Sequence, residues 1–178
     1  FKERKSFAWL KGTAEETGLP DNSVDWVLMG SSFHWADAPR AVKEFRRILK
    51  PGGLFTAIWN PRDIERSELH KEIESVVHAE IPHMKRVSSG GTVTTEEMEK
   101  KLCAGGYFKN IIFMECNHEE VMTKERYMNI WRSVNDIQVQ AGEEGFRRIL
   151  NGIEEKLKTY DTVAVPYRSR AWTAQVCK

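Results

Sequence analysis

A helix stop between two apolar runs is the feature that most constrains the fold of this 178-residue chain. Residues 26–29 (WVLM) form the first run, and residues 54–59 form the second directly after Lys-Pro-Gly-Gly at 50–53. A lysine favours a helix C-terminus, a proline cannot continue the helix, and glycines allow a left-handed turn. The order strand, helix, strand predicts a βαβ unit, and the unbroken apolar runs predict parallel strands covered on both faces.

The rest of the chain extends this unit into a larger α/β fold. Between the two runs, Asp37 can cap a helix that carries Pro39 in its first turn. We expect one α/β domain over residues 1–178, with helical insertions at 61–93 and 119–160. Further strands are expected at 7–10, 111–116 and 163–176, and further helices at 64–81, 95–102, 125–134 and 144–160.

The bulk composition argues against several classes of function. A formal net charge of +1 offers no basic surface for a nucleic acid, and no apolar run approaches the roughly 18 residues that span a bilayer. The three cysteines are far apart and lack a C-x-x-C spacing, which favours a reduced, cytoplasmic protein. The five histidines form no three-ligand pattern, since His78 and His83 are separated by Pro82, so no metal site is expected.

A series of short motifs carries a family resemblance. In order, residues 12–60 contain G-x-A-E, L-P-D-x-S-x-D, H-W and L-K-P-G-G. Each motif alone is weak, but the series resembles the middle of class I S-adenosylmethionine-dependent methyltransferases, in the small-molecule branch that includes ubiquinone/menaquinone-biosynthesis and trans-aconitate-type enzymes. The resemblance implies a Rossmann-like, mostly parallel sheet with an antiparallel last strand. It also implies methyl transfer to a small-molecule acceptor, with the two insertions on the acceptor side.

The resemblance also concerns what the sequence lacks. In the family a Gly-x-Gly-x-Gly loop follows the first strand and an acidic residue ends the second, and neither feature occurs here. Residues 7–10 would therefore be the family's third strand and residues 25–29 its fourth. The expectation is the C-terminal two-thirds of a domain, inactive alone, with residues 26–29 as an exposed edge strand. Such an edge predicts one of three outcomes: pairing into a homodimer, a rearranged or detached N-terminal segment, or residues that precede Phe1 filling the gap.

The cofactor residues follow from the motifs. By resemblance, Thr13, Ala14 and Glu15 frame the adenine of S-adenosylmethionine, and the alternative is an ordinary turn after a strand. Gly30 and Ser31 end a strand, where a missing side chain would let the backbone approach the methionine part of the cofactor. The alternative for Gly30 is a glycine at a β-bulge or one required by close packing.

The acceptor residues are chosen by chemistry and position. His34 is the candidate catalytic residue, able to deprotonate an acceptor hydroxyl or orient a carboxylate, and the alternative is a structural loop histidine. Trp35 and Trp59 would form walls of the acceptor pocket, with core packing as the alternative. In a W-R-S pattern, Trp131 and Arg132 would bind the acceptor through the planar guanidinium, unless Arg132 is simply a solvated helix residue.

Two other functions compete with methyl transfer to a small molecule. Base-amine methyltransferases of this fold carry an N-P-P-Y-like motif after the fourth strand, where this chain has Gly-Ser-Ser-Phe at 30–33. A nucleic-acid substrate is therefore not expected. The second alternative is a non-catalytic remnant or binding module that keeps the methyltransferase-like fold.

Overall fold

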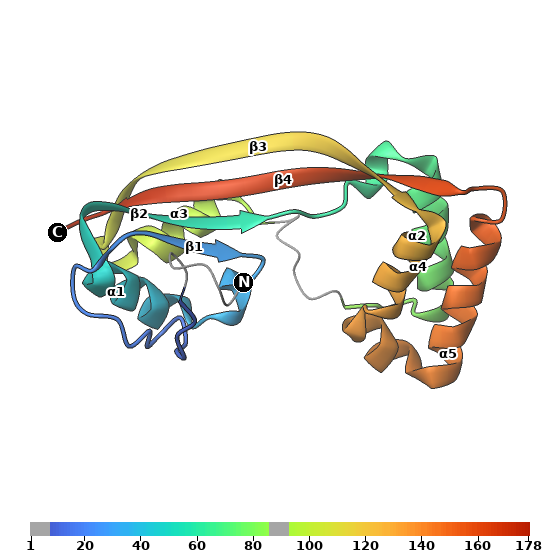
Figure 1. The fold of residues 1–178 in the computed structure, drawn as a ribbon, viewed down its shortest axis with the longest axis horizontal. Helices are drawn as coiled ribbons and strands as arrows, with labels where there is room; N and C mark the ends of the chain where they lie inside the picture. Colours follow the sequence, from blue (N-terminus) through green and yellow to red (C-terminus); the bar gives the residue numbers. More distant parts are fainter. Residues whose placement is uncertain (1–7, 86–92) are drawn as a thin grey trace. The chain divides into compact units, whose positions relative to one another are not determined.

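The computed structural model describes residues 8–85 and 93–178, which divide into two compact units. Within these ranges, the first unit contains residues 8–59, Val93–Met114 and Arg170–Lys178, and the second contains residues 60–85 and Glu115–Ser169. Figure 1 shows the elements of each unit. The strands are β1 (Val24–Gly30), β2 (Leu49–Trp59), β3 (Phe108–Thr123) and β4 (Thr162–Val176); the α-helices are α1 (Ala38–Ile48), α2 (Glu68–Glu80), α3 (Thr95–Cys103), α4 (Lys124–Arg132) and α5 (Asn135–Lys156); short 3₁₀ helices are η1 (Phe33–Trp35), η2 (Ile64–Arg66) and η3 (Ala104–Gly106).

The strands form one open mixed sheet in the order β1-β2-β4-β3. β1 and β2 are parallel, with Gly30 paired to Ile58 at their carboxyl ends. β2 and β4 are antiparallel, with Trp59 paired to Arg170. The predicted βαβ unit and the predicted antiparallel last strand are therefore confirmed.

The helix stop acts differently from the prediction in one respect. α1 ends at Ile48 and β2 already begins at Leu49, so Lys-Pro-Gly-Gly forms the irregular start of β2 rather than a separate loop. The register against β1 shifts at this point. Gly52 has φ +80°, and a Cβ on Gly53 would lie 2.9 Å from the Lys50 carbonyl oxygen. Both positions therefore require glycine.

One face of the sheet in the first unit carries the hydrophobic core. Phe55 and Ala57 of β2 and Trp172 of β4 are buried there against Phe45 of α1 and Leu102 of α3. The Asp37 carboxylate begins α1 by accepting a hydrogen bond from the Arg40 amide at 3.3 Å. α1 and α3 therefore cover the same face, because their apolar sides contact the same row of sheet residues.

The prediction that both faces of β1 are covered is wrong. Trp26 and Leu28 are 57% and 55% exposed, so β1 is not covered on both faces.

Residues 8–10 form neither strand nor helix, and Phe7 lies outside the described residues, so the strand predicted at 7–10 is wrong for residues 8–10. An apolar run forms a stable strand only where another strand takes up its backbone hydrogen bonds.

The second unit has its own core. α2, α4 and α5 pack with the adjoining ends of β3 and β4 around side chains such as Ile73, Trp131 and Ile153. α5 approaches α2 so closely that a Cβ on Gly152 would lie 2.6 Å from Val76. α5 joins two helical segments at Gly142, where the backbone is not helical (φ 66°), and the second segment begins close to the predicted residue 144. The insertions predicted at 61–93 and 119–160 fall in this unit except for residue 93, and residues 86–92 lie outside the described residues.

Candidate functional site

The loop that contains Thr13, Ala14 and Glu15 is held by short local hydrogen bonds. The Thr13 amide donates to the Glu16 carbonyl at 2.9 Å, and the Glu16 amide donates to Thr13 Oγ1 at 3.1 Å. The Glu15 carboxylate accepts from the Asp37 amide at 2.8 Å, just ahead of α1. This backbone hydrogen bond is the main reason that the pKa of Glu15 lies below its usual value. Glu15 therefore joins the loop to α1 rather than projecting freely.

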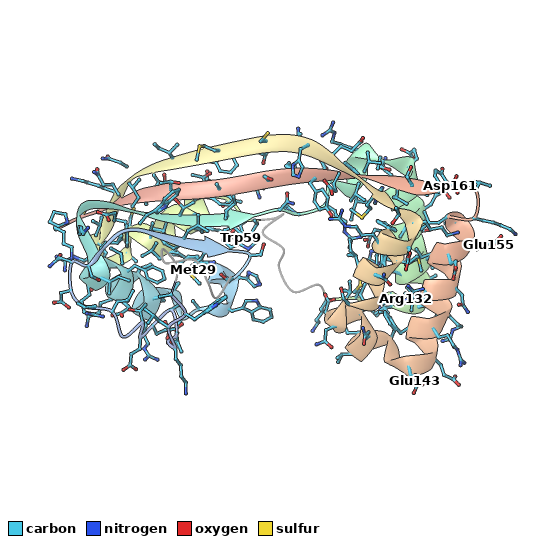
Figure 2. All side chains as sticks on the ribbon, in the orientation of Figure 1. Met29, Trp59, Arg132, Glu143, Glu155 and Asp161 are labelled. Carbon is cyan, nitrogen blue, oxygen red and sulfur yellow. The ribbon has the colours of Figure 1, made fainter. Side chains whose placement is uncertain are left out.

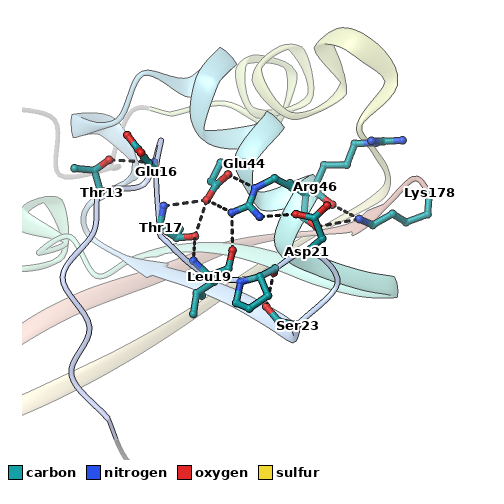
Figure 3. Close-up of polar contacts among 11 residues, drawn as sticks. Thr13, Glu16, Thr17, Leu19, Asp21, Ser23, Glu44, Arg46 and Lys178 are labelled. Atoms are coloured by element: carbon teal, nitrogen blue, oxygen red, sulfur yellow. Dashed lines mark hydrogen bonds and ion pairs between the residues drawn. The ribbon is translucent and has the colours of Figure 1, made fainter.

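A second carboxylate, Glu44 of α1, fixes the same loop from the other side. It accepts hydrogen bonds from the Thr17 amide at 2.9 Å and from the Thr17 hydroxyl at 2.6 Å. Arg47 donates to both Glu44 oxygens at 2.8 Å and also reaches Asp21 and the Leu19 carbonyl. Figure 3 shows this network. The hydrogen bonds from Arg47, followed by those from Thr17, lower the pKa of Glu44 to about 2.

Sequence reasoning missed Glu44 and Arg47. Their three-residue spacing on α1 was visible, but that spacing is common on any solvated helix face. Their loop partners lie 26 to 28 residues away in the sequence, as with Arg47 and Leu19 or Asp21. Only the fold reveals that they position the predicted adenine loop.

Gly30 and Ser31 lie where β1 ends beside the end of β2. Ser31 has φ +46°, and its amide donates to the Ile58 carbonyl at 2.8 Å. A Cβ built on Gly30 meets no atom of the described residues within 4 Å. Close packing by the protein therefore does not explain the glycine, and the space above it is open to a ligand.

His34 and Trp59 are hydrogen-bonded to each other. Trp59 Nε1–H donates to His34 Nδ1 at 3.2 Å, while the indole ring packs edge-on against Trp172 at 5.7 Å. Trp59 is only 2% exposed, so it is a core residue with one polar atom directed at His34. Since Nδ1 accepts a hydrogen bond, neutral His34 carries its proton on Nε2. Burial, with a smaller effect of Lys101, lowers the pKa of His34.

Trp35 is the exposed neighbour of this pair. It is 70% exposed, and its ring lies 4.8 Å from the His34 ring. A large apolar surface beside a polar imidazole edge can hold an organic molecule by contact while the imidazole N–H sets its orientation. Trp35 thus has the exposure that a pocket wall needs, whereas Trp59 does not.

Trp131 and Arg132 belong to the second unit, whereas the other predicted site residues belong to the first. Figure 2 labels Arg132 on its helix and Trp59 on its strand. Trp131 is fully buried, with the Arg62 guanidinium 4.6 Å from its ring centre. Arg132 is exposed and donates to Asn129 Oδ1 at 2.8 Å. The two neighbours in the sequence therefore have different environments, one in the core and one in solvent.

Two features are absent from the described residues, a cluster of metal ligands and a membrane-spanning helix. No group of three or more His, Cys, Asp or Glu side chains there could hold a metal ion. The helices of residues 8–85 and 93–178 include none with the length and apolar character needed to cross a membrane. All three cysteines are free thiols.

Comparison with protein families and curated proteins agrees with the predicted resemblance. Residues 1–57 match a family described as a methyltransferase domain. A Mycobacterium tuberculosis protein described as an uncharacterized methyltransferase is 47% identical over 68 residues, covering 38% of this chain and 28% of the relative. A similarly described Schizosaccharomyces pombe protein is 30% identical over 136 residues, covering 75% of this chain and 51% of the relative. The chain thus spans about half or less of the length of these relatives.

Solved structures show the same fold. A structure described as a type II methyltransferase from Anaeromyxobacter dehalogenans has a TM-score of 0.58 at 20% identity, covering 90% of this chain and 68% of the other. One described as a methyltransferase from an antibiotic biosynthesis pathway of Anabaena variabilis has a TM-score of 0.53 at 14% identity, covering 94% and 74%. The predicted resemblance to Rossmann-like methyltransferases is confirmed.

Proposed function

We propose that this chain forms part of an enzyme that transfers a methyl group from S-adenosylmethionine to a small-molecule acceptor. The observation that carries the proposal is the open space above Gly30, at the joint carboxyl end of β1 and β2. Ligands of open α/β sheets bind at this end of parallel strands. A Cβ at Gly30 would project into that space, so the position suits the close approach of a cofactor.

The loop at 13–15 supplies the adenine contacts in this proposal. Thr13 Oγ1 uses one lone pair to accept the Glu16 amide, which leaves a second lone pair and the hydroxyl proton for an adenine edge. Glu44 and Arg47 are positioning residues, because their hydrogen bonds fix the neighbouring turn at Thr17. Gly30 and Ser31 take the methionine part of the cofactor.

Methyl transfer from S-adenosylmethionine requires little acid–base catalysis by the protein. S-adenosylmethionine supplies a methyl group that is already activated on a sulfonium, so the protein orients the acceptor and excludes water. His34 donates its Nε2–H to an acceptor oxygen in this scheme, since Nδ1 is occupied by Trp59. Trp35 forms one wall beside it.

One observation favours a second function, a binding module that shares the fold without catalysing methyl transfer. The chain contains no Gly-x-Gly-x-Gly segment, which in the resembled family binds the cofactor. A module of this kind would leave Gly30 without a cofactor contact. The two functions therefore differ in what a side chain at Gly30 does.

The test is the variant Gly30→Val. Because the added Cβ meets no atom within 4 Å among the described residues and φ at Gly30 is not positive, the variant should melt within a few degrees of the wild type. We expect S-adenosylmethionine binding, measured by equilibrium dialysis, to weaken at least tenfold. Leu28→Val controls for a strand substitution on the same side of β1. Equal cofactor affinity in all three proteins would refute the placement of the cofactor.

A further inference from the structure

A cluster of buried polar side chains lies inside the second unit and has no role in the proposed cofactor site. His70 of α2 and Tyr127 of α4 are each only 1% exposed, and their rings meet edge to face at 5.7 Å. Arg62, which precedes η2, is half-buried and acts electrostatically on both. Three separate segments therefore bring a guanidinium, an imidazole and a phenol together.

Two polar atoms of this cluster are buried without a hydrogen bond. His70 Nε2 and the Tyr127 hydroxyl have no hydrogen-bond partner in the described part of the chain. Arg62 and Trp131 lie near enough to the hydroxyl to act against the rise in its pKa that burial causes. Native proteins pair nearly all buried polar groups, so two adjacent exceptions indicate a missing partner.

Neutral His70 and Tyr127 each carry a proton that can be donated to a ligand. Ser67 Oγ accepts from the His70 amide at 3.4 Å and lies within hydrogen-bond distance of His70 Nδ1, at 2.8 Å. In the tautomer in which the Ser67 hydroxyl donates to Nδ1, the proton of neutral His70 is on Nε2. Burial is the largest cause that lowers the pKa of His70 to about 4, so the ring is neutral at neutral pH. Burial also raises the pKa of Tyr127 and keeps its hydroxyl protonated.

The local field favours a negative ligand. Glu74 of α2 is a buried carboxylate that acts on both His70 and Tyr127, but at each of them the effect of Arg62 is larger than that of Glu74. No ion pair of Arg62 with a carboxylate occurs in residues 8–85 and 93–178. Its guanidinium lies 4.6 Å from the ring centre of Trp131. Such stacking restricts the guanidinium while its in-plane N–H groups remain able to bind an oxyanion.

We propose that Arg62, His70 and Tyr127 form a binding site for the oxyanion of a small molecule, a carboxylate or a phosphate group. The ligand enters beside Arg62, the most exposed of the three side chains. Its oxygens accept hydrogen bonds from the guanidinium, from His70 Nε2–H and from the Tyr127 hydroxyl. The assignment does not depend on the proposed methyl transfer, because it uses only residues of the second unit.

Imidazole NMR resonances of the full chain test the proposal directly. Sodium acetate and sodium phosphate are titrated separately at pH 7.5, with sodium chloride holding the ionic strength constant. We expect at least one of them to shift the His70 Nε2 resonance saturably, and the comparison of the two identifies carboxylate or phosphate as the ligand group. Arg62→Gln should weaken the response at least tenfold, whereas Arg66→Gln, an exposed arginine of the same segment, should preserve it. A linear shift, or an equal response in both variants, means an adventitious ion only and overturns the proposal.

The melting temperature of Tyr127→Phe provides a second test that does not require Arg62→Gln to fold. Removal of a buried hydroxyl that lacks a partner should leave the melting temperature in chloride buffer unchanged or higher. The effective anion should raise the melting temperature of the wild type but not that of the variant. Tyr160→Phe, at an exposed tyrosine, is the matched control. A lower melting temperature of Tyr127→Phe in chloride would show a structural hydrogen bond instead and would contradict the site.

Discussion

Single carboxylates do much of the positioning in the first unit. Glu15 holds the start of α1, and Glu44 holds the turn at Thr17. Both accept backbone N–H groups, and such hydrogen bonds stabilise the charged form of a carboxylate. The predicted adenine loop is therefore preorganised by side chains that need not touch the cofactor.

Replacement of Glu44 by glutamine should destabilise the protein by about 2 kcal/mol, because the amide cannot accept all of the hydrogen bonds from Thr17 and Arg47. Since the pKa of Glu44 falls from 4.5 to about 2 on folding, its stabilising effect is present above pH 4.5 and is lost as the pH falls toward 2. Urea unfolding at pH 7 and pH 3 measures both effects. Glu16→Gln, in the exposed part of the same loop, should change stability by less than about 0.5 kcal/mol. Equal losses in the two variants would contradict this role of Glu44.

His70 predicts a second dependence of stability on pH. Its pKa falls from 6.5 to about 4 on folding, so between these values the unfolded chain binds more protons and stability decreases as the pH is lowered. The loss should approach about 3 kcal/mol by pH 4. Unfolding of His70→Phe should lack this part of the pH dependence, whereas His78→Phe, at an exposed position of the same helix, should retain it. A wild-type stability that is flat between pH 6.5 and 4 would refute the prediction.

At the residue scale, the sequence predicted which residues could be functional, but not which side chains they would contact. The motifs identified the loop at 13–15 and the glycine at 30, because those positions follow from local spacing. The bond from Trp59 to His34 joins residues 25 apart, and Arg62 acts on Tyr127 across a still longer separation. No local pattern encodes such pairs, which is why the oxyanion cluster was not predicted from sequence.

At the scale of elements, β1 differs from the strand that the sequence predicts. Its apolar run was correctly assigned to a parallel strand at the edge of the sheet, but Trp26 and Leu28 face solvent instead of a covering layer. The sequence pattern shows that residues are apolar, but it does not show which other segment covers them. The same reason explains the failure of the strand predicted at 7–10.

The exposed edge of β1 predicts self-association. In an antiparallel pairing of two copies centred on Val27, Trp26 of one copy faces Leu28 of the other, and no like charges are opposed. We expect a concentration-dependent dimer in sedimentation velocity experiments. Leu28→Lys should weaken the dimer at least tenfold, while Val139→Lys, at an exposed position of α5, should leave it unchanged. A wild-type chain that stays monomeric at all concentrations would contradict this prediction.

At the scale of the whole molecule, the sequence predicted the fold class but not its assembly. The mixed sheet and the helices between its strands follow from local patterns and the family resemblance. The division into two units was not predicted, because single long strands are divided between them. β3 and β4 each contribute residues to both units. In the same way, β4 pairs with β2 across more than a hundred residues, as Thr56 does with Thr173.

In the proposed function, the carboxyl ends of β1 and β2 bind the adenosyl cofactor. The most direct measurement is a titration of the ¹⁵N-labelled chain with S-adenosylhomocysteine, followed by its amide resonances. We expect shifts at Thr13, Ala14, Glu15, Gly30 and Ser31. The affinity should be millimolar, since the sequence lacks the glycine-rich loop and each lost hydrogen bond to a charged group weakens binding by about 1.5–3 kcal/mol. Micromolar binding with shifts elsewhere, or no shift at these five amides at saturating ligand, would contradict the account.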